Sequence, residues 1–316
     1  RRQRQMCIRD RNIITNFGSG ITVAGAVLIA QYIGAGEKED ARSMANQIFA
    51  CAMGFAVVCA TLCFLGTPAI VNWLGADGGT AYYARVYLRV VIWDMPFLYM
   101  VNIFSAVHQA QGDTVRPMFL NLGGITLNLF LDPFFMIILN LGTAGAALAT
   151  LLAKAIPAIV AFGLLCRQEN DICLNRKYMR LQKEKLGMIL KIGLPTAIGG
   201  STMQLGFLLM SKNVFVYGTE AMAAYGIGNK VNGLITLPSN AIGSATATIV
   251  GQNMGAKQSD RAEKGYRFSM WISVVFLFIG GMILSRDMIS TAIVRIFSKD
   301  AEVVGMAADF LSVMVF

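Results

Sequence analysis

The stretch "AQYIGAGEKEDARS", residues 30–43, returns in altered form as "GQNMGAKQSDRAEK", residues 251–264. The two copies share Gln31/Gln252, Gly34/Gly255, Ala35/Ala256 and Ala41/Ala262 at a constant offset of 221 positions. A second pair, "VNWLGAD" at 71–77 and "VRIFSKD" at 294–300, recurs at nearly the same offset. Chance similarity between apolar helices is the alternative. Two matches at matching offsets in hydrophilic stretches favour an internal repeat, and therefore two related halves.

The composition is that of a membrane protein. Hydrophobic residues make up 55% of the chain, charged residues only 14%, and the mean hydropathy is +0.57, whereas soluble domains carry about 25% charged residues. Arg42 and Asp77 bracket 34 consecutive residues without a formal charge, and about 20 apolar residues suffice to cross a bilayer. A very apolar soluble helical protein is the alternative that this pattern disfavours.

Hydrophobic runs between turn signals predict nine helical segments. These are 13–34, 46–74, 81–107, 117–139, 143–165, 187–216, 221–252, 266–285 and 302–316. No segment has the alternating ten-residue pattern of a membrane barrel. The expected fold class is an all-α membrane protein, a polytopic helical bundle.

The basic residues of the loops predict the orientation. If the helices alternate, one side holds twelve Lys and Arg residues in the loops near 35–45, 108–116, 166–186 and 253–265, and the other holds only Arg286, Arg295 and Lys299. The richer side is expected to face the cytoplasm of a multi-pass protein in the plasma (inner) membrane. The formal charge of +9 then reflects topology, and no nucleic-acid partner is needed to explain it. Both copies of the repeat loop lie on this side, which predicts a parallel repeat about an axis along the membrane normal.

The expected domain organisation is based on the repeat. Residues 1–11, "RRQRQMCIRDR", do not fit the topology and resemble a non-native leader. Residues 12–166 would form the N-terminal lobe, 167–186 a cytoplasmic linker and 187–316 the C-terminal lobe. Each half should hold six helices, but the first shows five and the second four. The chain is therefore expected to be incomplete at both ends, lacking one helix at the start and two to three at the end.

Several motifs resemble the multidrug and toxic compound extrusion (MATE) transporters. They are "GAGEKEDAR", "HQAQGDTVRPM", "LNLFLDPFFM", "GAALAT", "IGLPTAIGG" and "IVGQNMGAK", in this order along the chain. The resemblance covers essentially everything from Gly18 onward. It implies two six-helix lobes facing a central cavity, and export of cationic or amphipathic organic compounds in exchange for protons or sodium ions. The same resemblance implies no enzymatic activity.

Asp132 is the leading candidate for a functional residue. It lies in the apolar run "TLNLFLDPFFMIIL", residues 126–139, where a carboxylate costs about 2.5–3.5 kcal/mol on insertion scales. Counting outward from the tight turn near 141 places Thr150 level with Asp132, and Asn128 one turn away on the same face. These oxygens could hold a proton or a hard cation, and the resemblance implies the same three residues. A structural Asp satisfied by an interhelical hydrogen bond is the alternative.

Other polar residues in the segments are weaker candidates. Asp94 lies near the depth of Asp132 and could be a second titrating group or a structural partner. Gln204 stands where a sodium-linked subgroup of the family has a carboxylate, and Lys230 lies inside a helix, where snorkelling or cavity exposure are both open. Met203, Phe207 and Met210 form a stripe that suits packing or a promiscuous cavity. The candidates for the substrate cavity are the five of these residues in the second half: Gln204, Met203, Phe207, Met210 and Lys230.

The expected function is a cation-coupled antiporter that exports organic cations or amphipathic drugs by alternating access. It would work as a monomer in the lipid bilayer, without a cofactor or bound metal. The alternative is a lipid-linked oligosaccharide flippase of related fold, which should show a cavity rich in Arg and Lys, and the segments offer chiefly Lys230. A membrane-embedded enzyme is disfavoured, because the one histidine, His108, lies at a helix end.

Overall fold

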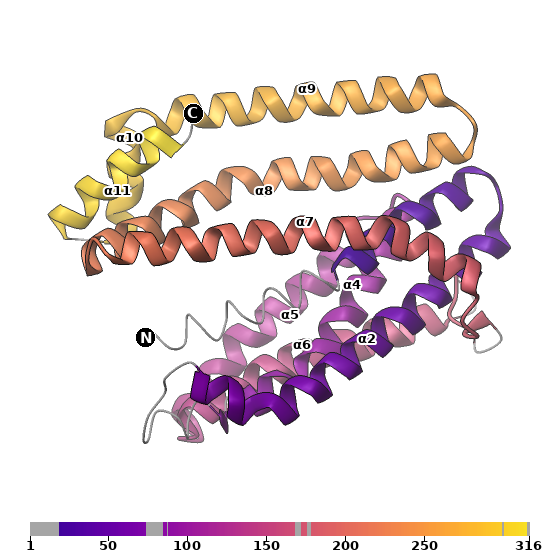
Figure 1. The fold of residues 1–316 in the computed structure, drawn as a ribbon, viewed down its shortest axis with the longest axis horizontal. Helices are drawn as coiled ribbons and strands as arrows, with labels where there is room; N and C mark the ends of the chain where they lie inside the picture. Colours follow the sequence, from indigo (N-terminus) through magenta and orange to yellow (C-terminus); the bar gives the residue numbers. More distant parts are fainter. Residues whose placement is uncertain are drawn as a thin grey trace. The chain divides into compact units, whose positions relative to one another are not determined.

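The computed structural model describes residues 19–73, 85–86, 88–167, 172–175, 178–298 and 300–314. The regular structure of these residues is helical throughout (Figure 1). The helices are Ser19–Gly34, α2 (Lys38–Trp73), α4 (Asp94–Ala110), α5 (Val115–Pro133), the π-helix η1 (Phe134–Ile138), α6 (Gly142–Cys166), α7 (Lys183–Phe215), α8 (Thr219–Gly255), α9 (Ser259–Leu284), α10 (Asp287–Phe297) and α11 (Ala301–Met314). The expectation of an all-α polytopic fold is confirmed.

Six helices of the described part are long and apolar enough to cross a membrane. They are Lys38–Pro68, Leu88–Ala110, Val115–Ile138, Ala144–Cys166, Lys183–Phe215 and Ser259–Leu284. The helix α8, with 37 residues, is longer than any of these, but its many Gly, Ser, Thr and Asn residues make it less apolar. Large apolar side chains on the spanning helices are exposed, including Ile125, Leu129 and Phe130 on α5. Such exposure is the expected state of a surface that faces lipid.

The chain divides into two compact units. The first comprises residues 1–202 and 254–257, and the second comprises 203–253 and 258–316, so that α7 crosses from one to the other. In the first unit α4 packs against α2, α5 and α6 (Figure 1). Its core combines buried alanines of the helix Ser19–Gly34 and of α2 with Ile103 and Phe104 of α4. Small residues at these contacts let the helix backbones approach closely, which is how helices associate in lipid.

The repeated loop has the same backbone conformation in both halves. Gly36 has φ 78° and Lys257, its counterpart 221 positions later, has φ 58°. Glu37 N–H donates to Tyr32 C=O and Gly36 N–H to Ile33 C=O, and at the same offset Gln258 N–H donates to Asn253 and Lys257 N–H to Met254. Each set is a Schellman motif, in which a left-handed residue ends one helix. The helices after these turns, α2 and α9, begin at Lys38 and Ser259, also 221 positions apart.

One expected external loop proves to be a helix. The charges of Arg286, Arg295 and Lys299 predict a connection over residues 286–301, but α10 occupies Asp287–Phe297. Its buried residues, Ser290 and Val294, are both fully enclosed and lie one turn apart, and the helix packs against α11. Eleven residues with a single apolar face form an amphipathic helix, and charges at its ends do not prevent it. The nine expected segments therefore omit one helix of the described part.

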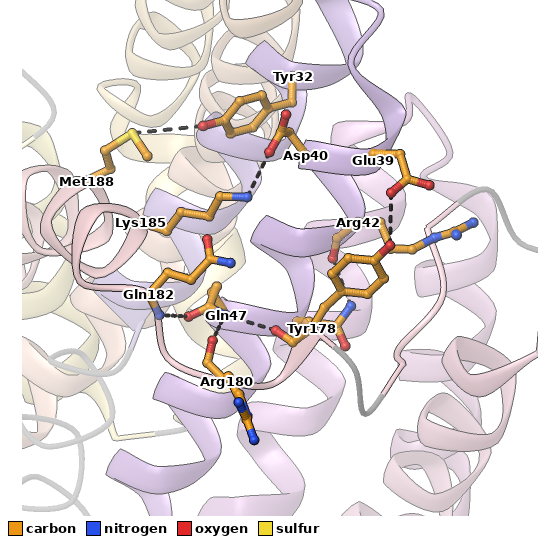
Figure 2. A network of polar contacts seen from close by, with 11 residues as sticks. Tyr32, Glu39, Asp40, Arg42, Gln47, Tyr178, Arg180, Gln182, Lys185 and Met188 are labelled. Carbon is orange, nitrogen blue, oxygen red and sulfur yellow. Dashed lines mark hydrogen bonds and ion pairs between the residues drawn. The ribbon is translucent and has the colours of Figure 1, made fainter.

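The linker between the expected lobes is bound to α2 through its backbone. Asn46 and Gln47, both fully buried, accept and donate hydrogen bonds along it. Asn46 binds Cys173 C=O and Asn175 N–H. Gln47 binds the carbonyls of Tyr178 and Arg180 and the N–H of Gln182 (Figure 2).

Two side chains of the linker region add to this attachment. Tyr178 Oη donates to Glu39 at 2.9 Å, which raises the pKa of the Tyr178 phenol above its ordinary value. Lys185 lies 2.9 Å from Asp40 (Figure 2). The residues 1–11, expected to be a leader, and parts of the linker lie outside the described residues. The expected domain boundaries remain predictions.

Candidate cation site

Asp132 lies in the last turn of α5, where its side chain is half-buried. Asn128, one turn earlier, donates from Nδ2 to Asp132 Oδ1 at 3.5 Å, the long end of the hydrogen-bond range. Side chains four residues apart lie on the same helix face, and the structure places this pair as the spacing predicts. The contact joins the Asn128 amide and the Asp132 carboxylate on one face of the helix.

The chain changes its helical geometry directly after Asp132. Pro133 has no N–H, so the carbonyl four residues earlier, that of Leu129, receives no hydrogen bond from it. The next five residues form the π-helix η1, and π-helical turns often occur at functional sites. The hairpin then closes through Asn140 (φ 51°) and Gly142 (φ 54°). The regular α-helix thus ends at Pro133, one residue after Asp132.

A cavity of about 260 Å³ lies between α4, α5 and α6. Its polar lining residues are Asn121 and Asn128 from α5 and Thr150 and Lys154 from α6. The Thr150 hydroxyl donates to Ala146 C=O at 2.9 Å, which leaves its oxygen able to accept a hydrogen bond or bind a cation. The structure thus brings Asn128 and Thr150 to one cavity. Asp132 is joined to this group through Asn128.

Asp94 forms an ion pair that the sequence reasoning missed. Its Oδ2 atom lies 2.6 Å from Nζ of Lys154, and the carboxylate side chain is fully buried. Two roles are open for Asp94, a second titrating group or a structural partner, and both remain predictions. The signal was present in the sequence. Counting outward from the turns near 112 and 141 places Asp94 level with residue 152, two positions from the only basic residue of α6.

The basic residue that lines the cavity is Lys154, not Lys230 as the sequence suggested. Lys230, the chief candidate for a basic group in a cavity, is exposed on α8. Lys154 is only 25% exposed and lines the cavity. The sequence reasoning missed Lys154 because it considered basic residues mainly in the loops, where they indicate topology.

The expected substrate residues lie on α7 and α8. Met203, Phe207 and Met210 are exposed by 64%, 42% and 53%, and Gln204 is half-buried. These residues and Lys230 belong to the second unit, whereas Asp94, Asn128, Asp132 and Thr150 belong to the first. Their role in a substrate cavity remains a prediction.

The helices of the described part that are long and apolar enough to cross a membrane, the helical repeat and the polar side chains within these helices define the class as a multi-pass membrane protein. Within that class, the chain belongs to the MATE family. The sequence model of that family, MatE, matches residues 5–134 and 195–316. The resemblance inferred from the motifs is therefore confirmed, and the family consists of transporters and not of enzymes.

Named relatives are 24% and 29% identical to the chain over the aligned residues. The "Probable multidrug resistance protein YoeA" of Bacillus subtilis (strain 168) is 24% identical over 309 residues, which cover 95% of this chain and 66% of the relative. The "Probable multidrug resistance protein NorM" of Thermotoga maritima is 29% identical over 301 residues, covering 92% and 62%. The chain thus spans slightly less than two thirds of the length of these curated relatives.

Solved structures confirm the fold. The structure described as the outward-facing conformation of a multidrug resistance MATE family transporter of the MOP superfamily has a TM-score of 0.88 at 21% identity, covering 99% of this chain and 70% of that one. A MOP superfamily transporter from Pyrococcus furiosus, described by a reverse polarity of its binding pocket that suggests a different function, has a TM-score of 0.87 at 22% identity, covering 95% and 67%.

Proposed function

We propose that this chain forms part of a cation-coupled exporter of organic compounds. Family membership supports transport, and the names of the relatives, which include multidrug export proteins, support multidrug efflux. The observation that carries the coupling role is the Asn128–Asp132 contact beside the cavity lined by Thr150. A carboxylate is rare inside a membrane and usually functional.

The proposed role of Asp132 is to bind the coupling cation, a proton or a sodium ion. Asn128 and Thr150 supply neutral oxygen atoms, which suit a hard cation. Binding removes the cost of a buried negative charge, and nearby helices can then shift toward a conformation that the unbound carboxylate disfavours. A cation moves this equilibrium only through its different affinity for the two conformations. This difference is the energetic link between the cation gradient and export by alternating access.

The proposed substrates are organic cations or amphipathic drugs, bound by the C-terminal lobe. Met203, Phe207 and Met210 offer flexible, polarizable and aromatic surface, with Gln204 as a polar contact and Lys230 at a helix surface. Their exposure on α7 leaves these side chains accessible to a ligand. The proposed transporter is a monomer in the plasma membrane.

A lipid-linked oligosaccharide flippase is the second candidate. Lys154 in the cavity lining favours it, because a pyrophosphate needs basic groups. However, the Lys154 ammonium lies 2.6 Å from the Asp94 carboxylate, so its charge is already balanced. A cavity with one paired lysine supports an exporter of cations better than a transporter of pyrophosphates.

The variant Asp132→Asn tests the proposed function in the full gene product that contains these 316 residues. Asn keeps the size of the side chain but cannot carry the charge, so gradient-driven efflux of a fluorescent cationic dye should be abolished. Dye binding and membrane insertion should remain. Thr150→Ala should weaken coupling less, since a neutral ligand contributes about 0.5–1.5 kcal/mol. The assay is efflux from proteoliposomes under an imposed proton or sodium gradient.

The matched control is Asn121→Ala, which removes another polar residue of the same cavity and helix but lies almost two turns before Asn128. Its efflux should stay near that of the wild type. Wild-type efflux in Asp132→Asn at equal expression would show that the carboxylate is structural.

A further inference from the structure

The end of α6 and the returning part of the linker are joined by a backbone hydrogen bond. The helix ends at Cys166, and Leu174 N–H donates to Leu165 C=O at 2.9 Å. The chain therefore leaves this bond through Cys166 and comes back to it through Cys173. Each cysteine directly follows or precedes a bonded residue, with about 3.8 Å between the Cα atoms. The hydrogen bond thus brings the two cysteines close together.

Asn46 of α2 also binds this part of the linker. Its side chain donates to Cys173 C=O at 3.2 Å and accepts from Asn175 N–H at 2.9 Å. Asn46 is fully buried, and Cys173 is only 6% exposed. Residues 173–175 therefore make three backbone hydrogen bonds to two helices, α2 and α6. These bonds fix the position of Cys173 at the end of α6.

The two cysteines differ in their accessibility. Cys166 is exposed and Cys173 is buried, and their thiols are close enough to interact electrostatically. A reagent in solution can therefore reach Cys166, whereas Cys173 can react with a group that is already attached to Cys166. An accessible thiol next to a second, resolving thiol is the arrangement of redox-sensing cysteines.

The other described cysteines lack this arrangement. Cys51, Cys59 and Cys63 all lie on α2. Cys59 and Cys63 are four residues apart, so helix geometry keeps their Cβ atoms about 5–6 Å from each other. A disulfide needs a Cβ separation of about 3.5–4.5 Å, which α2 could provide only if its backbone were distorted. This pair is the matched control within the same chain.

We infer that Cys166 and Cys173 form a thiol–disulfide site, which reacts with a low-molecular-weight disulfide such as glutathione disulfide and attaches the linker to α6. The Cys166 thiolate attacks one sulfur of the reagent, forms a mixed disulfide and releases one glutathione. The Cys173 thiolate then attacks the Cys166 sulfur, forms the protein disulfide and releases the second glutathione. Two protein thiols are oxidised and one reagent disulfide is reduced. The two thiol protons of the protein pass to the two glutathione thiolates.

The location of the site indicates what the reaction changes. The loop charges assign the linker to the cytoplasmic side, where disulfides are usually transient and redox-sensing. In the reduced protein, hydrogen bonds hold residues 173–175 against α6. In the oxidised protein, a covalent bond closes a loop of eight residues, 166–173, and keeps the linker at the helix end. The chemistry of this site does not depend on the proposed function.

The test uses the full gene product in detergent, with glutathione disulfide as the probe. After the reaction the free thiols are alkylated, and the protein is digested with trypsin without a reductant. Trypsin cleaves after Lys154, Arg167 and Arg176, so each cysteine lies on a peptide of its own, 155–167 or 168–176. The expected result is a disulfide-linked pair of these two peptides in the mass spectrum, which is lost on reduction.

The control pair and two variants test the order of the steps. The Cys59–Cys63 disulfide should be at least about tenfold less abundant than the linked peptides, because of its unfavourable Cβ separation. Cys173→Ser removes the resolving thiol, so the mixed disulfide of Cys166 with glutathione should accumulate. Cys166→Ser removes the accessible thiol, so Cys173 should remain a free thiol that is alkylated after denaturation.

The inference is overturned if the folded wild type gives no linked peptides, or if they form only after denaturation. Equal formation of the Cys59–Cys63 disulfide would overturn it too, because the reaction would then not depend on the position of the thiols. Glutathione on Cys173 in folded Cys166→Ser would contradict the proposed order of attack. The comparison within the wild type remains decisive if a variant does not fold, and folding is checked by the elution profile and the melting temperature.

Discussion

Buried polar side chains find their partners far away in the sequence. Asp94 pairs with Lys154, 60 residues later. Asn46 and Gln47 bind linker residues 127 to 135 positions later. A buried polar group without a partner costs about 1–3 kcal/mol, so each of these contacts fixes one segment of the chain against another. A small chemical change at one of these residues should therefore have the largest effect on the stability of the protein.

Gln47→Leu should destabilise the protein through the linker. The change removes three hydrogen bonds to the linker backbone and leaves its carbonyls and N–H group without their buried partner. The expected loss is about 2–3 kcal/mol, seen as a lower melting temperature in detergent and faster proteolysis of the linker. Gln182→Ala is the matched control, because Gln182 contributes its backbone N–H to the contact, which alanine keeps. Equal stability of the two variants would contradict this account.

At the scale of residues, the sequence predicted contacts within a single helix and missed contacts that depend on packing between helices. Asn128 and Asp132 lie four positions apart, so their contact results from helix geometry alone. The partner of Asp94 requires the relative depth of two helices that are not neighbours in sequence. The contacts of Gln47 go to backbone atoms, which carry no signal in the sequence of the linker.

At the scale of elements, the hairpin α5–η1–α6 depends on close approach at one glycine. A side chain on Gly145 would lie 2.6 Å from Phe135 C=O, a backbone atom of the π-helix. Pro133, which has no N–H to donate to Leu129 C=O, directly precedes the π-helix. Gly145 and Pro133 therefore fix how α6 meets the segment that carries Asp132.

Gly145→Ala should disturb this hairpin. Carbon and oxygen atoms at 2.6 Å overlap, so η1 or the start of α6 must shift, and such overpacking costs about 1–3 kcal/mol. Because the shift occurs directly after Asp132, coupled efflux should fall along with the melting temperature. Gly163→Ala, on the same helix with open space around it, should be neutral or slightly stabilising. Unchanged efflux and stability in Gly145→Ala would show that the hairpin adapts without cost.

Hydropathy predicted the positions of the helices except where a helix is short and amphipathic. The helix α10 carries Asp287 and Arg295 within eleven residues, and a search for long apolar runs passes over it. The repeat could have indicated it. Residues 38–73 form the continuous helix α2, and the positions 221 later run through α9 into α10. A helical counterpart to the end of α2 was therefore to be expected.

At the scale of the whole molecule, the repeat and the loop charges support one topology. Both Schellman turns, at Gly36 and Lys257, lie in loops that the charge count assigns to the side with twelve basic residues. The parallel orientation of the halves remains a prediction from the repeat and the loop charges. The bound linker lies on this side as well, since Gln47 and Asp40 of α2 contact it (Figure 2).

Single cysteines test this topology. In a cysteine-free background, a cysteine at Arg180, an exposed residue of the linker, should be shielded from a membrane-impermeant thiol reagent in intact cells. Cysteines at Leu141 and Thr219, which are exposed at the opposite helix ends, should be labelled. Permeabilised cells provide the control, because all three positions should then react and so prove accessible. We expect this pattern because basic loops are retained in the cytoplasm during insertion. Labelling of the linker alone in intact cells would show that every helix has the opposite orientation.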